Sequence, residues 1–299
     1  MEMLRIVQLH KNFGDKQVLC GVNLSVPKGS VFGFIGKNGS GKTTTMKTVL
    51  GLLQADSGEL FVDGEKVVYG QTATNRHIGY LPDVPQFYPF MTATEYLRFC
   101  GEITGMDKTE LQTRSQELLQ MVGLSDEKHR IQGYSRGMKQ RLGIAAALLH
   151  KPTLLICDEP TSALDPVGRK EILDILSAVR EQTTVLFSTH ILTDVERICS
   201  DVAFLDGGKI IEQGKIEDIK AKYRNEEYRL QTQDEDGARK VLAAFPCMQG
   251  GANNQLTFTE KTYSAKEVLR FVANEDVALV KWEQVEPSLE TLFMGVAEK

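Results

Sequence analysis

A glycine-rich stretch near the start of this 299-residue chain has the residue types and spacing of a phosphate-binding loop. Residues 36–43 read Gly-Lys-Asn-Gly-Ser-Gly-Lys-Thr, which is a glycine, four residues and then Gly-Lys-Thr. Glycines let the backbone curl so that its N–H groups point at phosphate oxygens, and the following helix adds its positive N-terminal end. Lys42 would supply a cation to the β- and γ-phosphates, and Thr43 a hydroxyl to Mg²⁺. A glycine-rich turn without this function is the alternative.

Two adjacent carboxylates come directly after an apolar run later in the chain. Leu154–Cys157 is typical of a buried parallel strand, and Asp158 and Glu159 follow it. Because ligands bind at the carboxyl ends of such strands, Asp158 is predicted to hold Mg²⁺ and Glu159 to activate or orient water beside the γ-phosphate. Solvated acids at a strand end are the alternative, and the phosphate loop upstream disfavours it.

A third motif lies just ahead of this strand, where residues 134–138 read Tyr-Ser-Arg-Gly-Met. Ser135 suits a helix N-terminus, and Gly137 permits a phosphate to approach the helix end. A simple N-capped helix is the alternative. The motif follows the phosphate loop by 93 residues, counted from Lys42 to Ser135.

With these motifs the chain resembles the ATP-binding subunits of ABC transporters over about residues 3–220. The signature of that family is commonly Leu-Ser-Gly-Gly-Gln, from which residues 134–138 depart at three positions. The variant is similar to that of bacterial exporters of the sodium-extrusion and bacitracin-resistance kind. The resemblance implies that ATP and Mg²⁺ bind to a P-loop fold, and that the signature helix faces the nucleotide of a second subunit.

The resemblance also implies roles for residues outside these motifs. Phe13 matches the aromatic residue that stacks on adenine, and His190 matches the switch histidine at the γ-phosphate. Asp165 ends the D-loop at the dimer interface. Asp83 stands where the coupling loop normally has a glutamine, with Gln86 one turn further on. The alternatives are that Phe13 is a core aromatic residue and His190 a structural histidine. For Asp165 the alternative is a helix-start turn, and for Asp83 a proline-rich surface turn.

The implied site residues fall into three groups. Those expected to bind the nucleotide are Phe13, Gly36, Lys37, Asn38, Gly39, Ser40, Gly41, Lys42, Thr43, Thr44, Asp83, Ser135, Gly137 and Asp165. Those expected to bind Mg²⁺ are Thr43, Asp83 and Asp158, and those expected to catalyse hydrolysis are Glu159 and His190.

The surrounding pattern predicts the elements that must position these residues. Strands are expected at 4–9, 18–26, 31–35, 58–68, 153–157, 184–187, 202–205 and 209–211, and helices at 42–53, 92–149 with interruptions, and 168–182. The alternation predicts an α/β fold. We expect a P-loop NTPase sheet, an N-terminal antiparallel β subdomain and a helical signature subdomain at about 88–150, within a cassette of residues 1–222.

After about Lys222 the pattern changes to strands at 228–231, 255–259 and 277–282 that alternate with helices. The helices are expected at 238–245, 265–273 and 289–296. This order predicts a small α+β accessory domain at residues 223–299, for which a ferredoxin-like arrangement is one option.

Composition and charge disfavour several other classes. The chain is 41% hydrophobic and 25% charged, which is ordinary for a globular protein. The net charge is −5 and the sequence contains no block of like charges, so no nucleic-acid partner is expected. The five cysteines show no CxxC spacing, which disfavours disulfides and zinc. No secretory signal or membrane span is visible, so we expect a cytoplasmic chain.

A single phosphate loop and a single signature imply a second cassette, either a copy of this chain or a paralogue. The resemblance further implies transmembrane permease subunits, which would hold the chain at the inner face of the cell membrane. We therefore predict an ATPase that powers transport, with export favoured by the signature variant and residues 287–293. The alternative is a non-transport ABC-type ATPase acting as a regulatory or mechanical module. An ABC-type DNA-repair ATPase would need a long coiled coil, and an ABC-type ribosome factor would need two cassettes. A P-loop kinase would need no signature motif.

Overall fold

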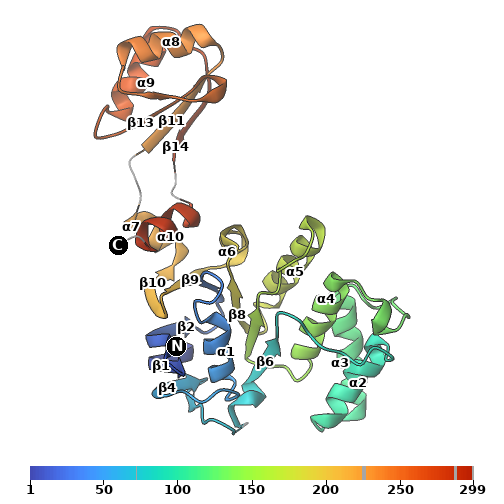
Figure 1. The fold of residues 1–299 in the computed structure, drawn as a ribbon. Coiled ribbons are helices and arrows are strands. Elements are labelled where there is room, and N and C mark those ends of the chain that lie inside the picture. Colours follow the sequence, from blue (N-terminus) through green and yellow to red (C-terminus); the bar gives the residue numbers. More distant parts are fainter. Residues whose placement is uncertain (72, 224–226, 286–287, 298–299) are drawn as a thin grey trace. The chain divides into compact units, whose positions relative to one another are not determined.

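The computed structural model describes residues 1–71, 73–223, 227–285 and 288–297 (Figure 1). Contacts divide the chain into two compact units, formed mainly by residues 1–216 and by residues 217–295. The strands are β1 (Glu2–Phe13), β2 (Lys16–Pro27), β3 (Val31–Ile35), β4 (Ser57–Val62), β5 (Glu65–Lys66), β6 (Ile78–Leu81), β7 (Leu154–Asp158), β8 (Thr184–Thr189), β9 (Asp201–Asp206), β10 (Lys209–Lys215), β11 (Glu227–Thr232), β12 (Gln249–Gly250), β13 (Gln255–Thr259) and β14 (Leu279–Gln284).

The α-helices are α1 (Lys42–Val49), α2 (Ala93–Ile103), α3 (Lys108–Met121), α4 (Arg136–Ala147), α5 (Pro166–Val179), α6 (Leu192–Ile198), α7 (Ile216–Lys222), α8 (Glu235–Ala244), α9 (Ala265–Asn274) and α10 (Leu289–Ala297). Short 3₁₀ helices are η1 (Ala73–His77), η2 (Ile131–Gly133) and η3 (Ala252–Asn254). Within the described residues, no helix is both long and apolar enough to cross a membrane.

A mostly parallel sheet forms the centre of the first unit. Its strand order is β10-β9-β3-β8-β7-β6, and each neighbouring pair is parallel except the edge pair β10–β9. Every residue of β3, β7 and β8 is buried, as expected of parallel strands covered on both faces. The carboxyl ends of β3, β7 and β8 therefore meet at one edge, where the loops after them can form one site.

An antiparallel sheet with the order β2-β1-β4-β5 shares a hydrophobic core with this central sheet. Leu4, Leu24 and Leu60 contribute to it from the antiparallel sheet, and Phe34 from β3. Met46 of α1 belongs to the same core, so α1 is fixed by packing against both sheets. The predicted antiparallel β subdomain is thus confirmed.

The helical region consists of α2, α3 and α4, which pack against one another (Figure 1). Each helix begins with a side-chain cap. Thr92 forms a capping box with Glu95, Asp107 accepts from the backbone N–H groups of Thr109 and Glu110, and Ser135 accepts from Met138. Such caps satisfy the free N–H groups of the first turn. They fix the point at which α4 starts, directly after Ser135.

The second unit has the element order β11-α8-β12-β13-α9-β14 and the strand order β12-β13-β11-β14, with every pair antiparallel. This is the ferredoxin-like arrangement. Leu230 and Phe258 of the sheet share a core with Val241 of α8 and Val268 of α9. The α+β class predicted for this region is confirmed.

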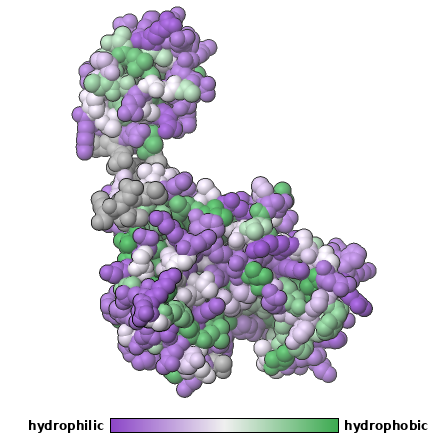
Figure 2. All heavy atoms as spheres, in the orientation of Figure 1, coloured by the Kyte–Doolittle hydropathy of each residue, from purple (hydrophilic) through white to green (hydrophobic). Residues whose placement is uncertain are grey.

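Several element bounds differ from the sequence-based expectations. The helix expected at 42–53 ends at Val49, because Gly51 adopts a left-handed φ of +67° that the helix cannot continue through. Strand β6 and helix α6 were not expected. On the face shown in Figure 2, hydrophilic side chains are interspersed with apolar patches on each unit, and the two hydrophobic cores lie inside.

Candidate functional site

The glycine-rich loop links the end of β3 to the start of α1, and two of its glycines are required by close contacts. A Cβ on Gly36 would lie 2.5 Å from Ser40 Oγ and 2.6 Å from the carbonyl oxygen of Leu205. Gly41 has a φ of +111°, and a Cβ there would lie 2.6 Å from Leu19 Cδ2. The curl of the loop therefore depends on the absence of side chains at these two positions.

Lys42 is almost completely buried, at 5% exposure, beneath this loop. Its Nζ donates to the carbonyl oxygens of Gly36 at 2.6 Å and Lys37 at 3.3 Å, and lies 3.1 Å from Glu159 Oε1. Ser40 Oγ is buried and has no hydrogen-bond partner among the described residues. A buried cation and an unpartnered hydroxyl in one loop fit an anionic ligand such as a phosphate group.

Asp158 lies at the carboxyl end of β7 and is 3% exposed. Thr43 Oγ1 donates to its Oδ2 at 2.7 Å, and Ser188 Oγ, from β8, donates to its Oδ1 at 2.6 Å. The two hydroxyl donors compensate a carboxylate that burial would otherwise destabilise. Carboxylate and hydroxyl oxygens in contact are also ligands that a hard divalent cation accepts.

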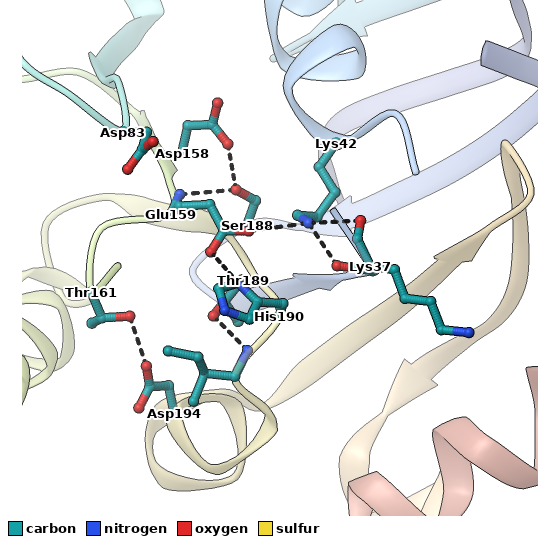
Figure 3. A network of polar contacts seen from close by, with 12 residues as sticks. Lys37, Lys42, Asp83, Asp158, Glu159, Thr161, Ser188, Thr189, His190 and Asp194 are labelled. Atoms are coloured by element: carbon teal, nitrogen blue, oxygen red, sulfur yellow. Dashed lines mark hydrogen bonds and ion pairs between the residues drawn. The ribbon is translucent and has the colours of Figure 1, made fainter. Parts of the chain in front are cut away.

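Glu159 adopts an unusual backbone conformation next to Asp158, with a φ of +50°. Its N–H group donates to Ser188 Oγ at 3.0 Å and to the Ser188 carbonyl at 3.2 Å, which hold this strained conformation in place. Its side chain lies between Lys42 and His190, whose Nδ1 is 2.9 Å from Oε2 (Figure 3). Oε1 is buried and lies 3.1 Å from the Lys42 ammonium group.

A cavity of about 470 Å³ opens in front of these groups. It is lined by Lys16, Val18, Asn38, Gly39, Gly41, Lys42, Thr43, Thr44, Asp83, Glu159, Ser162 and His190. The loop after β3, the residue after β7 and the residue after β8 thus meet here, as the strand order requires.

Phe13 does not line this cavity. It ends β1 with 49% of its surface exposed, and its ring lies 5.4 Å from the ammonium group of Lys11. Lys16 and Val18, which follow it on β2, line the cavity instead. Sequence reasoning missed these two residues, because their side chains carry no motif.

Ser135, Gly137 and Asp165 also lie outside the cavity. Ser135 caps α4, with Oγ accepting from the Met138 N–H at 3.2 Å, and Asp165 caps α5, with Oδ1 accepting from the Gly168 N–H at 3.0 Å. A Cβ on Gly137 would meet no atom nearer than 3.9 Å, so this face of the helix start is open. The cavity of their own chain is thus lined without them.

Asp83 lines the cavity and is held by α4. Its carboxylate lies 3.3 Å from Arg136 Nη2, and its carbonyl oxygen accepts from Gln140 Nε2 at 2.7 Å. Gln86 lines a different groove, of about 580 Å³, between the loop after β6 and helices α2 and α4. Asp83, not Gln86, is therefore the coupling-loop residue that faces the cavity.

Tyr80 on β6 is a further polar group that the sequence did not reveal. Burial, together with the nearby carboxylates of Asp158 and Asp83, raises the pKa of its phenol to about 12. Tyr80 lines the groove beside Gln86 rather than the cavity in front of Lys42.

A buried network behind the site links α5 to α6 and was also missed. Asp194 accepts from Thr161 Oγ1 at 2.7 Å and from Arg169 Nε at 2.5 Å. Thr161 directly precedes the D-loop, and Asp194 lies on the helix after His190 (Figure 3). The network joins the segment that carries His190 to the segment that ends at Asp165.

Comparison with known proteins agrees with this geometry. Residues 19–162 match the ABC transporter family model, and residues 214–297 match the C-terminal domain of DrrA1-3-like ATP-binding proteins. The chain is 36% identical to the uncharacterised ABC transporter ATP-binding protein YxlF of Bacillus subtilis over 98% of this chain and 99% of that protein. It is 37% identical to the bacitracin transport ATP-binding protein BcrA of Bacillus licheniformis over 78% of this chain and 76% of that protein.

Among solved structures, an ATP-binding subunit of an ABC transporter superposes with a TM-score of 0.66 and 30% identity, covering 74% of this chain and 93% of that chain. The chain therefore belongs to the ABC transporter ATP-binding proteins, which bind ATP and hydrolyse it to drive transport. Subunits of this family dimerise and work with membrane permease components. The predicted family, fold and ATPase class are confirmed.

Proposed function

We propose that Mg-ATP binds in the cavity in front of Lys42 and that Glu159 activates the attacking water. The observation that carries this proposal is the position of the Glu159 carboxylate, which lies between Lys42 and His190 in the lining of the cavity. The phosphate loop supports the same assignment, because its lysine and hydroxyls are directed into one cavity.

In the structure, Lys42 contacts loop carbonyls and Glu159. A triphosphate in the cavity would offer stronger anionic partners, so Lys42 would turn to the phosphate oxygens and release Glu159. Glu159 then accepts the proton of a water molecule, and His190 holds the carboxylate from the other side. The backbone bonds of Glu159 to Ser188 keep its position through this change.

Thr43 and Asp158 are the residues that would hold Mg²⁺, since their oxygens are already in contact. When bound there, Mg²⁺ supplies positive charge that offsets the charge on the phosphates. Asp83 lines the same cavity, and we propose it as a third oxygen donor on this side.

We further propose that two cassettes close face to face, as a homodimer or with a paralogue. Ser135 and Gly137 mark an open helix start, and neither residue lines the cavity of its own chain. In the closed pair this helix start would meet the nucleotide of the other cassette. Asp165, at the start of α5, would line the interface between the two.

A groove beside the coupling loop is the surface that we propose for the transmembrane permease. It is lined by Gln86, Phe87 and Tyr96 with His150 of the loop after α4. The exposed aromatic residues Tyr88 and Phe90 adjoin it along the chain.

Docking on this groove would hold the chain at the inner face of the cell membrane, and its permease would select the substrate. Export is favoured because the signature, Tyr134–Met138, resembles that of bacterial exporters. The relative BcrA, which is named for bacitracin transport, supports the same direction.

The proposal is tested by removing the buried cation. Lys42→Ala should lower the affinity for Mg-ATP by about ten-fold or more, because no other described side chain takes its place beneath the loop. Lys47→Ala is the matched control, an exposed lysine further along α1 that should bind as the wild type does. Equal affinity of Lys42→Ala and wild type in equilibrium binding would contradict the proposal.

A further inference from the structure

Two positions at which this chain departs from the common family motifs contact each other. Asp83 replaces the usual coupling-loop glutamine, and Arg136 replaces the first glycine of the signature. The carboxylate of Asp83 lies 3.3 Å from Arg136 Nη2. One turn further along α4, Gln140 donates to the Asp83 carbonyl at 2.7 Å. Helix α4 therefore holds Asp83 at two points.

The two contacts differ in burial. Gln140 is fully buried, so its bond to the Asp83 backbone anchors the coupling loop to α4. The side chains of Arg136 and Asp83 are 42% and 47% exposed. Exposed ion pairs contribute little stability, so this one can break while the backbone anchor remains.

Arg136 is the first residue of α4, between Ser135 and Gly137, and none of these three residues lines the cavity of its own chain. In the closed pair described under Proposed function, that helix start meets a triphosphate, which is a stronger anion than a single carboxylate. A guanidinium group can form paired hydrogen bonds with either partner. Arg136 thus has two alternative anions, one in each arrangement of the subunits.

We propose that Arg136 exchanges partners during closure, leaving Asp83 of its own chain for the nucleotide phosphates held by the second cassette. This proposal rests on the proposed function. Asp83 is then a positioning residue that competes with closure. Because Asp83 also lines the cavity of its own chain, the exchange links each nucleotide site to the signature that serves the other.

The test measures the ATP concentration that gives half-maximal dimer by sedimentation velocity, in full-length Glu159→Gln protein with Mg-ATP. Relative to the ATP dissociation constant of the monomer, Asp83→Asn should lower this concentration by up to about five-fold, since an exposed ion pair holds Arg136 only weakly. Arg136→Gln should raise it. In the Arg136→Gln background, Asp83→Asn should change this concentration only by the factor by which it changes the ATP affinity of the monomer, because no cation is left to release.

Controls separate the exchange from damage to the fold. Asp174→Asn removes the acid of a similarly exposed pair, Arg197–Asp174 at 2.8 Å, and should leave dimerisation unchanged. Arg136→Lys keeps the charge and should recover part of the loss caused by Arg136→Gln. The ATP affinity of the monomer is measured beside each variant, and thermal unfolding confirms that each is folded.

Three results would overturn the exchange. The first is an equal effect of Asp83→Asn with and without Arg136→Gln, which would mean that the two residues act independently. The second is ATP binding without a dimer in any variant, which would leave Arg136 no second partner. The third is absence of ATP binding to the Glu159→Gln parent, which would contradict the proposed function itself and the exchange with it.

Discussion

The two units of this chain use the same elements for different purposes. Both bury aliphatic side chains between helices and a sheet, yet the ATP-binding unit also buries charge, with Lys42 and Asp158 at 5% and 3% exposure. In the described part of the C-terminal unit, ion pairs such as Arg229–Glu283 at 3.2 Å remain partly exposed. The buried polar residue in this described part is Thr232, which carries no charge.

This difference in buried charge indicates which unit contains the ligand site. Burying a charge is unfavourable unless other groups compensate it, so a cluster of compensated charges at strand ends marks a site built for a ligand. The C-terminal unit instead gains its stability from aliphatic and aromatic packing, including Tyr228, Phe258 and Trp282. The comparison can be sharpened by variants that disturb one unit and leave the other intact.

The largest effect is expected in the core of the C-terminal unit. Leu230→Ala removes a fully buried side chain and should destabilise that unit by about 2–5 kcal/mol. Trp282 is the single tryptophan of the chain, so its fluorescence in urea reports on this unit. Turnover of Mg-ATP should stay within about two-fold of wild type. A large loss of ATP binding in Leu230→Ala would show that the two units are not independent.

Ser188→Ala tests the compensation of buried charge. It removes the hydroxyl that donates to Asp158 at 2.6 Å, and a hydrogen bond to a charged group contributes about 1.5–3 kcal/mol. Thermal unfolding of the ATP-binding unit should register this loss. The counterpart is Thr232→Val, which removes a bond to the neutral carbonyl of Asp234 and should cost about 0.5–1.5 kcal/mol. Equal losses would remove the distinction between the units.

Gly36→Ala tests the fit of the phosphate loop. The added Cβ would overlap Ser40 Oγ and the Leu205 carbonyl, and overpacking of this kind costs about 1–3 kcal/mol. ATP affinity should fall by about ten-fold or more. Gly251→Ala, in the C-terminal unit, meets no atom nearer than 3.6 Å and should bind ATP normally. Unchanged affinity in Gly36→Ala would mean that the loop can relax around a side chain.

The smallest effect concerns Tyr80. The pKa of its phenol, about 12, lies above the ordinary value of 10.0. The contribution of this burial to the free energy of unfolding is therefore fully present below pH 10 and is lost as the pH rises through about 12. Raising the pH from 8 to 10.5 should therefore lower the free energy of unfolding slightly more for wild type than for Tyr80→Phe. Parallel pH profiles of the two proteins would contradict this expectation.

The sequence predicts the central elements well where local pattern decides them. Val31–Ile35 and Leu154–Cys157 are continuous apolar runs that belong to buried strands, and the strand Gln255–Thr259 has the bounds that were expected. Strand β6 was missed because it has four residues and contains Gly79. That glycine is fixed by a distant contact, since a Cβ would lie 2.2 Å from the Ala147 carbonyl.

The residues of the candidate site also differ in whether the sequence predicts them. Lys42, Asp158 and Glu159 belong to local motifs and could be found from their spacing. Ser188 and Tyr80 could not, because their roles arise from strands that pair only in the folded chain. The Asp194 network escaped detection for the same reason.

The most direct test of the account is to compare ATP binding and turnover in wild type and Glu159→Gln. The substitution keeps the shape of the side chain but removes the base, while Lys42, Thr43 and Asp158 remain to hold Mg-ATP. We expect unchanged or tighter binding and a turnover lower by about 10²-fold or more. Turnover of Glu159→Gln equal to that of wild type, in a preparation free of other ATPases, would contradict the central claim that Glu159 activates the water.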